Sequence, residues 1–156
     1  MNNFFKTYWK YVIVVLSIVL VAGLGSLFVN LGLDWFGKLE KPTNFIPSFV
    51  IPVVWSIIYT SYAIVLCIWL KNENIPISTI VFLILNGVFN ILWCLFFFTL
   101  NNTLLGLIVI VINLILAILL TIDIYKKIPL FSYILSLYPV WLCLATCLNL
   151  STWILN

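Results

Sequence analysis

Aromatic and hydrogen-bonding side chains recur at helical spacing in three apolar stretches of the chain. Read at steps of three or four residues, these stripes are Trp55, Tyr59 and Tyr62; Asn86, Asn90, Trp93 and Phe97; and Tyr138, Trp141, Ala145 and Asn149. Residues at this spacing share one face of a helix. Flat rings mixed with a few polar tips are typical of a pocket for a flat apolar ligand. Packing between helices explains the same pattern, so both interpretations stay open on composition alone.

Conventional catalytic and metal-binding residues are scarce. The sequence has no histidine and no arginine, and its only methionine is the first residue. Histidine bases, histidine or methionine haem ligands and arginine clamps are thereby excluded. All four cysteines stand in apolar runs, and although Cys143 and Cys147 share a helix face, two thiols alone make a poor metal site. We therefore expect no metal, no cofactor and no ordinary catalytic constellation. The lysines are too dispersed for nucleic-acid binding.

The overall composition places these stripes in a membrane. Charged residues make up 7% of the chain and hydrophobic residues 65%, with a mean hydropathy of +1.29. Soluble domains carry about 25% charged and about 45–50% apolar residues. A chain with so little polar surface is expected to be an integral membrane protein in contact with the lipid bilayer.

The seven lysines and four acidic residues leave five long uncharged windows, at about 11–33, 49–70, 77–100, 104–122 and 128–155. Each window approaches the ~20 residues that a helix needs to cross a bilayer. Backbone polar groups in hydrocarbon must be satisfied within one segment, which favours helices. We predict an all-α fold, with residues 1–156 forming a single domain of five transmembrane helices. The first window also resembles a secretory signal, but its apolar run exceeds the about 7–15 residues of such a segment.

Short connections make neighbouring helices antiparallel, and one connection is longer. Residues 34–48 include Trp35 and Ile46 and are too apolar for a solvated linker, so we expect a lid that folds back over one mouth of the bundle. Five lysines fall on the side of the amino terminus, whereas Lys38 and Lys41 fall on the other side. This bias predicts a cytoplasmic amino terminus and an external carboxyl terminus.

Three further tryptophans stand near the ends of apolar windows: Trp9, Trp69 and Trp153. Tryptophan favours the membrane surface because its ring is apolar and its N–H group is polar. We expect these three side chains to lie in the aromatic belts of the two membrane surfaces.

Three motifs resemble those of the TspO family, also described as tryptophan-rich sensory protein, translocator protein or peripheral-type benzodiazepine receptor. They are Lys41-Pro42, Pro47 and Val54-Trp55-Ser56-Ile57-Ile58-Tyr59; Leu85-Asn86, Asn90-Ile91-Leu92-Trp93 and Phe97-Phe98; and Tyr138-Pro139-Val140-Trp141, Ala145-Thr146 and Leu148-Asn149. The motifs follow the family's order and fall on the corresponding predicted helices. The similarity runs from about residue 35 to residue 149, and the length and number of helices agree.

The resemblance implies a five-helix receptor in a bacterial plasma membrane, often a homodimer. It implies binding of porphyrins and other flat hydrophobic ligands beneath the loop that joins the first two helices. Trp55 and Trp141 match pocket tryptophans linked in the family to light-dependent porphyrin degradation. We predict ligand contacts from Trp35, Pro47, Trp55, Tyr59, Tyr62, Asn86, Asn90, Trp93, Tyr138, Trp141 and Ala145.

The sequence departs from the family pattern in the predicted lid. The family's lysine-proline-x-tryptophan-x-proline-proline reads Lys41-Pro42-Thr43-Asn44-Phe45-Ile46-Pro47 here. Asn44 replaces a tryptophan and Ile46 replaces a proline, which alters lid rigidity and ligand choice. After Asn149 no tyrosine is followed by a basic residue, so the cholesterol motif proposed for animal members is absent.

Three functions are compatible with these residues. The first is a membrane-embedded binding or sensory protein for porphyrins, in which Asn90 donates a hydrogen bond and Lys38 or Lys41 meets a carboxylate. The second is light-dependent porphyrin degradation, with Trp55 and Trp141 as redox partners of the excited macrocycle. The third is a transporter, or an accessory subunit of one, for small hydrophobic molecules, although no ionisable group stands at mid-membrane. The first is the function we predict.

Overall fold

The structure is a computed structural model that describes residues 2–42, 46–47 and 49–156. Five stretches of it are long and apolar enough to cross a membrane: Tyr8–Leu31, Val50–Asn72, Ile77–Thr99, Thr103–Tyr125 and Pro129–Leu155. The predicted all-α architecture is confirmed, and the protein is an integral membrane bundle of five spanning helices. Thr43, Asn44 and Phe45 of the predicted lid lie outside the described residues.

The helices do not coincide fully with the uncharged windows. The elements, in chain order, are α1 (Asn2–Leu31), α2 (Leu33–Lys38), α3 (Val50–Asn72), α4 (Ile77–Cys94), the π-helix η1 (Leu95–Thr99), α5 (Thr103–Tyr125), α6 (Pro129–Leu135) and α7 (Leu137–Leu155). The predicted lid region thus begins with a short helix, α2. The fourth window forms one helix, whereas the third ends in a π-helix and the fifth is divided into two helices.

The division between α6 and α7 follows from a proline. Pro139 stands in the first turn of α7 and has no backbone N–H group with which to continue the helical ladder. The flanking bonds persist, because Ser136 N donates to Ser132 O at 2.8 Å and Val140 N donates to Ser136 O at 3.2 Å. The two helices therefore cross the membrane together as one interrupted segment.

The π-helix η1 changes which side chains reach the core. Leu100 N donates to Leu95 O at 2.9 Å, five residues back. This wider turn lets two consecutive residues, Phe97 and Phe98, both be buried, at 2% and 8% exposure. Asn102 then caps α5, its side-chain oxygen accepting from the backbone N–H of Leu105 at 2.9 Å.

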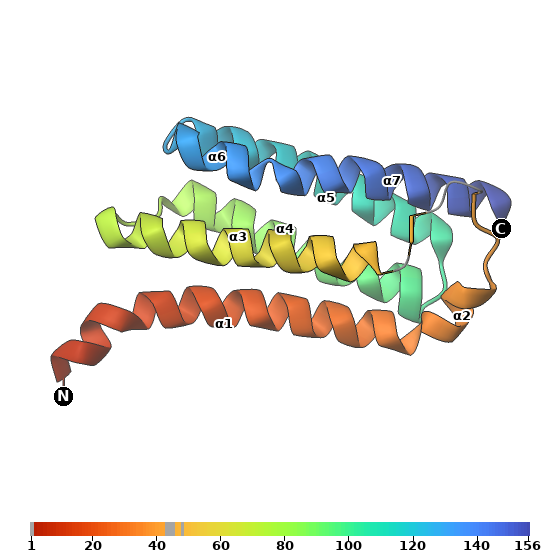
Figure 1. The fold of residues 1–156 in the computed structure, drawn as a ribbon, viewed down its shortest axis with the longest axis horizontal. Coiled ribbons are helices and arrows are strands. Elements are labelled where there is room, and N and C mark those ends of the chain that lie inside the picture. Colours follow the sequence, from red (N-terminus) through yellow and green to blue (C-terminus); the bar gives the residue numbers. More distant parts are fainter. Residues whose placement is uncertain (1, 43–45, 48) are drawn as a thin grey trace.

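The helices run side by side, with α1 at one edge of the bundle and α5, α6 and α7 at the opposite edge (Figure 1). α5 packs against α4 on one side and against α6 and α7 on the other, while α1 packs against α3, α4 and η1. Among the elements bounded above, α3 has no close backbone contact with α4, although residues 73–76 join them directly. Among the five spanning segments, the one in α1 has the smallest buried share.

The carboxyl-terminal end of α1 is fixed against η1. Gly32 lies so close to the Phe98 backbone that a Cβ atom on it would be 2.1 Å from the Phe98 carbonyl oxygen. Thr99 Oγ1 donates to Phe28 O at 2.9 Å and adds a hydrogen bond at the same end. At the other end of the helix, Lys10 Nζ donates a hydrogen bond to the Asn74 side chain.

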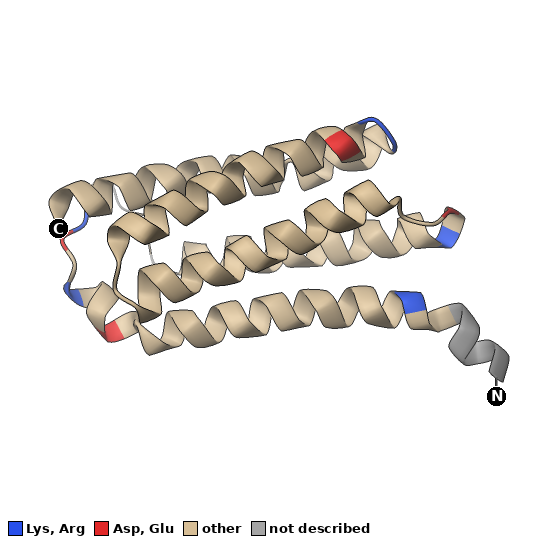
Figure 2. Cartoon of the chain, turned by 180° about the vertical axis from the view of Figure 1, so that it is seen from behind, with Lys and Arg blue, Asp and Glu red and all other residues tan. Residues whose placement is uncertain are grey.

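Charged residues gather at the two ends of the bundle (Figure 2). At the end that carries the amino terminus, Asp123 accepts from Lys127 Nζ at 2.7 Å and from Thr79 Oγ1 at 2.6 Å, which ties the end of α5 to the start of α4. At the opposite end, the Asn156 side chain accepts from Glu40 N at 3.0 Å and donates to Glu40 O at 3.1 Å.

The close approach at Gly32 yields a prediction for stability. In Gly32→Ala the new methyl group meets a backbone oxygen, so we expect a loss of about 1–3 kcal/mol of unfolding free energy from overpacking. The matched control is Gly23→Ala in α1, where a methyl group would have nothing within 4 Å of it. Melting temperatures in one detergent compare the variants, and equal values for the two would contradict the close contact.

Candidate functional site

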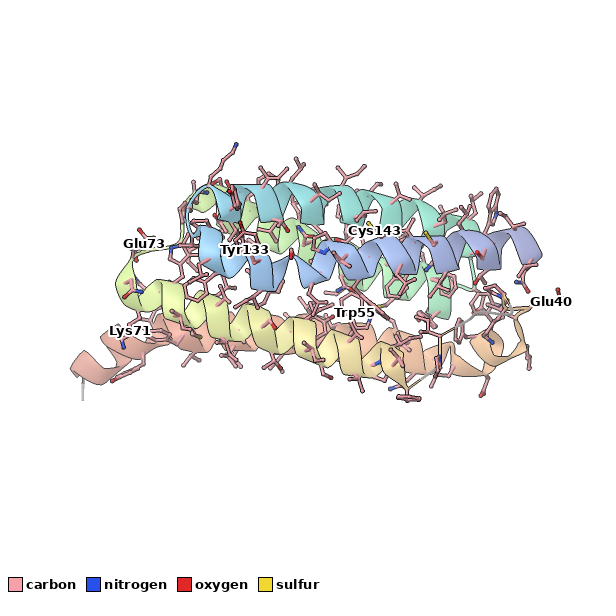
Figure 3. All side chains as sticks on the ribbon, turned by 45° about the horizontal axis from the view of Figure 1, so that its top comes forward. Glu40, Trp55, Lys71, Glu73, Tyr133 and Cys143 are labelled. Carbon is pink, nitrogen blue, oxygen red and sulfur yellow. The ribbon has the colours of Figure 1, made fainter. Side chains whose placement is uncertain are left out.

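The middle of the bundle holds a cluster of aromatic rings centred on Trp55, whose side chain lies between α3 and α7 (Figure 3). Its ring stacks on Tyr59 at a centroid distance of 5.5 Å and on Trp93 at 6.3 Å. The Tyr138 ring lies 6.0 Å from Trp55, and the Phe97 ring stacks on Trp93 at 6.2 Å. Rings at these distances attract one another beyond the effect of burial. One aromatic cluster therefore connects α3, α4, η1 and α7.

Asparagine side chains connect this cluster to other helices. The pairs are Trp93 Nε1 to Asn149 Oδ1 at 3.1 Å, Asn113 Nδ2 to the Tyr138 hydroxyl at 3.0 Å, and Asn90 Nδ2 to the Tyr59 hydroxyl at 3.2 Å. Each pair satisfies polar groups that would be costly to leave alone in a hydrocarbon environment. Asparagine therefore joins helices, as the packing interpretation expects, and it does so within the same stripes of residues that also suggested a ligand pocket.

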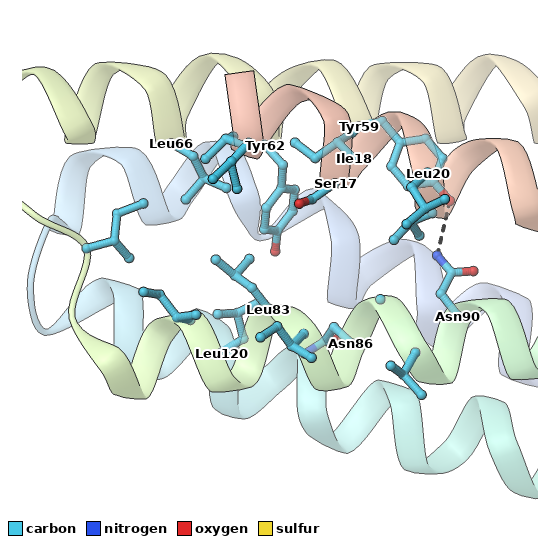
Figure 4. Close-up of a pocket in the computed structure, with 18 of the residues that line it drawn as sticks. Ser17, Ile18, Leu20, Tyr59, Tyr62, Leu66, Leu83, Asn86, Asn90 and Leu120 are labelled. Carbon is cyan, nitrogen blue, oxygen red and sulfur yellow. Dashed lines mark hydrogen bonds between the residues drawn. The ribbon is translucent and has the colours of Figure 1, made fainter. Parts of the chain in front are cut away.

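A cavity of about 590 Å³ lies between α1, α3 and α4 (Figure 4). Trp55, Tyr59 and Asn90 line its inner end, and Trp9 and Lys10 line its outer end, at the amino-terminal side of the bundle. Most of its remaining wall is aliphatic. Its volume falls within the about 300–1,000 Å³ of small-molecule sites in proteins.

This cavity, the larger of two described here, opens on the outer face of the bundle. Three residues that line it are also largely exposed: Ile13 at 51% and Leu20 at 60% on α1, and Ile84 at 59% on α4. This face is apolar and belongs to spanning helices, so it is suited to contact with lipid. An apolar molecule could therefore pass between α1 and α4 without entering water.

A second cavity, of about 50 Å³, lies next to α2, where the resemblance places the family's pocket. Trp55 and Trp141 both line it, together with Trp93 and Ala145. Aromatic rings from α2 and η1 fill much of this region, since the Phe36 ring lies 5.2 Å from Phe98. This space is too small for a macrocycle in this conformation.

The predicted ligand contacts thus divide between two cavities. The larger cavity collects Trp55, Tyr59, Tyr62, Asn86, Asn90 and Tyr138. The smaller cavity collects Trp55, Trp93, Trp141 and Ala145. Trp35 and Pro47 line neither: the Trp35 ring packs on Phe97 at 5.7 Å, and Pro47 is exposed. Only Trp55 belongs to both cavities.

The lid lysines line neither cavity, and the three tryptophans expected in the membrane-surface belts differ in exposure. Lys41 Nζ donates to Phe36 O at 2.7 Å, and neither it nor Lys38 lines either cavity. Lys10 is the lysine at the larger cavity. Trp9 and Trp153 are exposed on the outside of the bundle, whereas Trp69 is 2% exposed and its Nε1 donates to the Glu73 carboxylate, just beyond the end of α3, at 2.9 Å.

Sequence reasoning missed the contribution of α1 to the larger cavity. The lining residues from this helix are Trp9, Lys10, Ile13, Val14, Ser17, Ile18, Leu20 and Val21. Most of these residues are aliphatic, and they show no periodic polar or aromatic pattern. Lys10 and Ser17 are the polar residues among them, and two polar residues do not predict a cavity wall. Within the part of the chain that the structure describes, no three cysteine or acidic side chains come together as metal ligands.

Comparisons with known proteins agree with the architecture. Residues 13–154 match the model of the TspO/MBR family. The chain is 30% identical over 151 residues to the tryptophan-rich protein TspO of Archaeoglobus fulgidus, covering 94% of this chain and 97% of that protein. It is also 30% identical over 127 residues to the protein CrtK of Rhodobacter capsulatus, covering 78% of each. The chain therefore belongs to the TspO/MBR family of membrane proteins.

Proposed function

We propose that this protein is a membrane-embedded binding or sensory protein for porphyrin-like tetrapyrroles and other flat hydrophobic ligands. The observation that carries the proposal is the larger cavity, whose inner end is formed by the stacked Trp55 and Tyr59 rings. A flat macrocycle can stack on such rings, and its apolar rim suits the aliphatic walls. Membership of the tryptophan-rich sensory family supports the same ligand class.

A positive charge at the outer end of the cavity indicates which edge of a porphyrin would lie there. Porphyrins carry carboxylates at one edge, and Lys10 lines the cavity near the membrane surface. A carboxylate there could accept a charge-assisted hydrogen bond from Lys10 Nζ in place of the Asn74 side chain. The macrocycle would then lie deeper, against Trp55. In this orientation the partner of the ligand carboxylate is Lys10, and not Lys38 or Lys41 of the predicted lid.

Binding is tested by titrating the protein with protoporphyrin IX and following tryptophan fluorescence. We expect saturable quenching, and in Trp55→Ala an affinity about tenfold lower, because stacking contributes about 0.5–1.5 kcal/mol beyond burial. The control is Trp153→Ala, which removes a tryptophan that lines neither cavity. No saturable quenching below roughly 100 μM in the wild type would refute the proposal. Unchanged affinity in Trp55→Ala would place the ligand elsewhere.

Light-dependent degradation of the bound porphyrin is the second candidate, favoured by the position of Trp55 at the larger cavity. Dioxygen would be the oxidant, and both of its atoms would enter the opened macrocycle. Trp55 would give an electron to the excited macrocycle and take one back from the oxygenated ring, so that the net step is addition of O2. Transport is a weaker candidate, because the described charged residues lie at the ends of the bundle.

Illumination in air separates degradation from binding. Replacing an indole by a phenyl ring keeps an aromatic face but gives a poorer electron donor, so Trp55→Phe should bind porphyrin within about 1 kcal/mol of the wild type yet bleach it several-fold more slowly. Trp141→Phe should have a smaller effect, because Trp141 lines only the smaller cavity. Loss of porphyrin absorbance measures the rates. Equal bleaching in the wild type and Trp55→Phe would remove Trp55 from the chemistry.

We further infer a homodimer in a bacterial plasma membrane, with the amino terminus in the cytoplasm. The family supports the homodimer, and the distribution of lysines supports the orientation. In a variant without the four native cysteines, Asn156→Cys should react with an impermeant thiol reagent in intact cells, whereas Lys126→Cys should react only after lysis. The reverse labelling pattern would invert the orientation.

A further inference from the structure

The larger cavity is long and narrow, and it runs along the helices that surround it. The residues that line it extend from residue 9 to residue 21 on α1, from 55 to 70 on α3 and from 80 to 91 on α4. At a rise of about 1.5 Å per residue, these stretches are about 17–23 Å long. A volume of about 590 Å³ spread over that length leaves a cross-section of about 30 Å². Apolar carbon atoms in contact lie about 4 Å apart, so one extended alkyl chain fits along this space.

A single cation lies at the outer end of this space. Lys10 is the one charged residue among the described residues that line the cavity, and its Nζ donates to the neutral Asn74 side chain. Among the described side chains, Lys10 forms no ion pair. An ammonium group has three donors, so Lys10 can bind a further acceptor. A cation at one end of an apolar cavity complements a ligand with an anionic head and an apolar tail.

The position of Lys10 along α1 places it near the membrane surface. It stands close to the beginning of the spanning segment Tyr8–Leu31, next to Trp9, whose side chain is 50% exposed. Lysine and tryptophan are typical of the membrane surface at the ends of spanning helices. Further along, the cavity opens toward lipid at Leu20 and Ile84, which are both exposed. An amphiphile can therefore enter sideways from the bilayer while its head stays at the surface and its tail stays among apolar groups.

We propose that the larger cavity binds a long-chain fatty acid. The carboxylate accepts a charge-assisted hydrogen bond from Lys10 Nζ, and the alkyl chain extends inward toward Trp55. Figure 4 shows Ser17, Leu66 and Leu83, one each from α1, α3 and α4, around the space that the chain occupies. One chain, rather than the two of a phospholipid, matches the cross-section. This site goes beyond the proposed porphyrin function and does not depend on it, although the two ligands exclude each other.

The test titrates cis-parinaric acid and its methyl ester into the protein in phosphatidylcholine nanodiscs, at a pH that ionises the acid. Both probes carry the same conjugated chain, and energy transfer from tryptophan reports binding, since Trp9 and Trp55 line the cavity. Affinities are expressed per mole of nanodisc lipid, which removes the effect of partitioning into the bilayer. A hydrogen bond to a charged group is worth about ten- to hundredfold when buried and less at a surface, so we expect the acid to bind about tenfold more tightly than the ester.

Two lysine variants test the head of the ligand. Lys10→Gln keeps a polar side chain but removes the charge, so it should weaken the acid about tenfold and leave the ester unchanged. Lys71→Gln is the matched control, because Lys71 is exposed at the same end of the bundle but does not line the cavity (Figure 3). It should change neither affinity. An equal loss of acid binding in both variants would assign the effect to surface charge in general and overturn the site.

Two substitutions on α1 test the path of the chain. Ser17→Phe places a ring in the cavity and should weaken the acid and the ester alike, about tenfold, because the ring occupies volume that the chain needs. Val19→Phe adds the same ring at a position that is 59% exposed and does not line the cavity, so both affinities should persist. Circular dichroism and melting temperature confirm that the variants fold.

Three further results would overturn the proposal. Equal affinities of the wild type for the acid and the ester would show that the carboxylate is not recognised. Weaker acid binding in Lys10→Gln but not in Ser17→Phe would restrict the contact to the head of the ligand at the membrane surface. Displacement of the acid by phosphatidylglycerol added to the nanodiscs would assign the site to a phospholipid.

Protoporphyrin titration of the wild type keeps the two proposals apart. Porphyrin quenching without saturable binding of the acid refutes the fatty-acid site alone. Saturable binding of the acid without porphyrin quenching refutes only the porphyrin function.

Discussion

The constraint on which this structure depends is that polar side chains inside a hydrocarbon layer have to find partners within the protein. Asparagine meets this requirement here by pairing with aromatic hydroxyl or indole groups across helices, as in Trp93 with Asn149 and Tyr138 with Asn113. These bonds are directional and join elements distant in sequence, unlike dispersion forces, which lipid tails supply equally well. They position the aromatic rings, which pack together around Trp55 at one end of the larger cavity.

A few buried polar atoms of the described side chains have no hydrogen-bond partner. The Trp141 indole N–H group is one of them and belongs to the wall of the smaller cavity, the Tyr62 hydroxyl and Asn86 Oδ1 belong to residues that line the larger one, and Asn113 Oδ1 lies in the core away from both. Trp55 separates the two spaces and lines both. A guest that displaced this one ring could connect them, which relates the large cavity of this conformation to the region beside α2 where the family resemblance places its ligands.

Much of this arrangement could be predicted from the sequence, for identifiable reasons. Charges are so costly in hydrocarbon that their positions mark the helix ends, and helical spacing correctly grouped Tyr59 with Tyr62 and Asn86 with Asn90 around one space. The cavity wall from α1 was not predictable, because a helix that is apolar on all sides carries no periodic signal. The packing of Trp35 on Phe97 was not predictable either, because it depends on η1. That π-helix changes which side chains face the core, and no residue type in its sequence predicts it.

The contact between Gly32 and Phe98 also has a mechanical consequence. It holds α1 near one end, while the spanning part of the helix extends back over 24 residues to Tyr8, an arm of about 36 Å. Rotation of such an arm by about 5° about the fixed end would displace its free end by about 3 Å, with little change near the pivot. Lateral pressure from the surrounding lipids acts along the whole arm, and the Lys10–Asn74 hydrogen bond near its far end opposes the displacement. Lipid thus contacts one side of a helix whose other side forms a wall of the larger cavity.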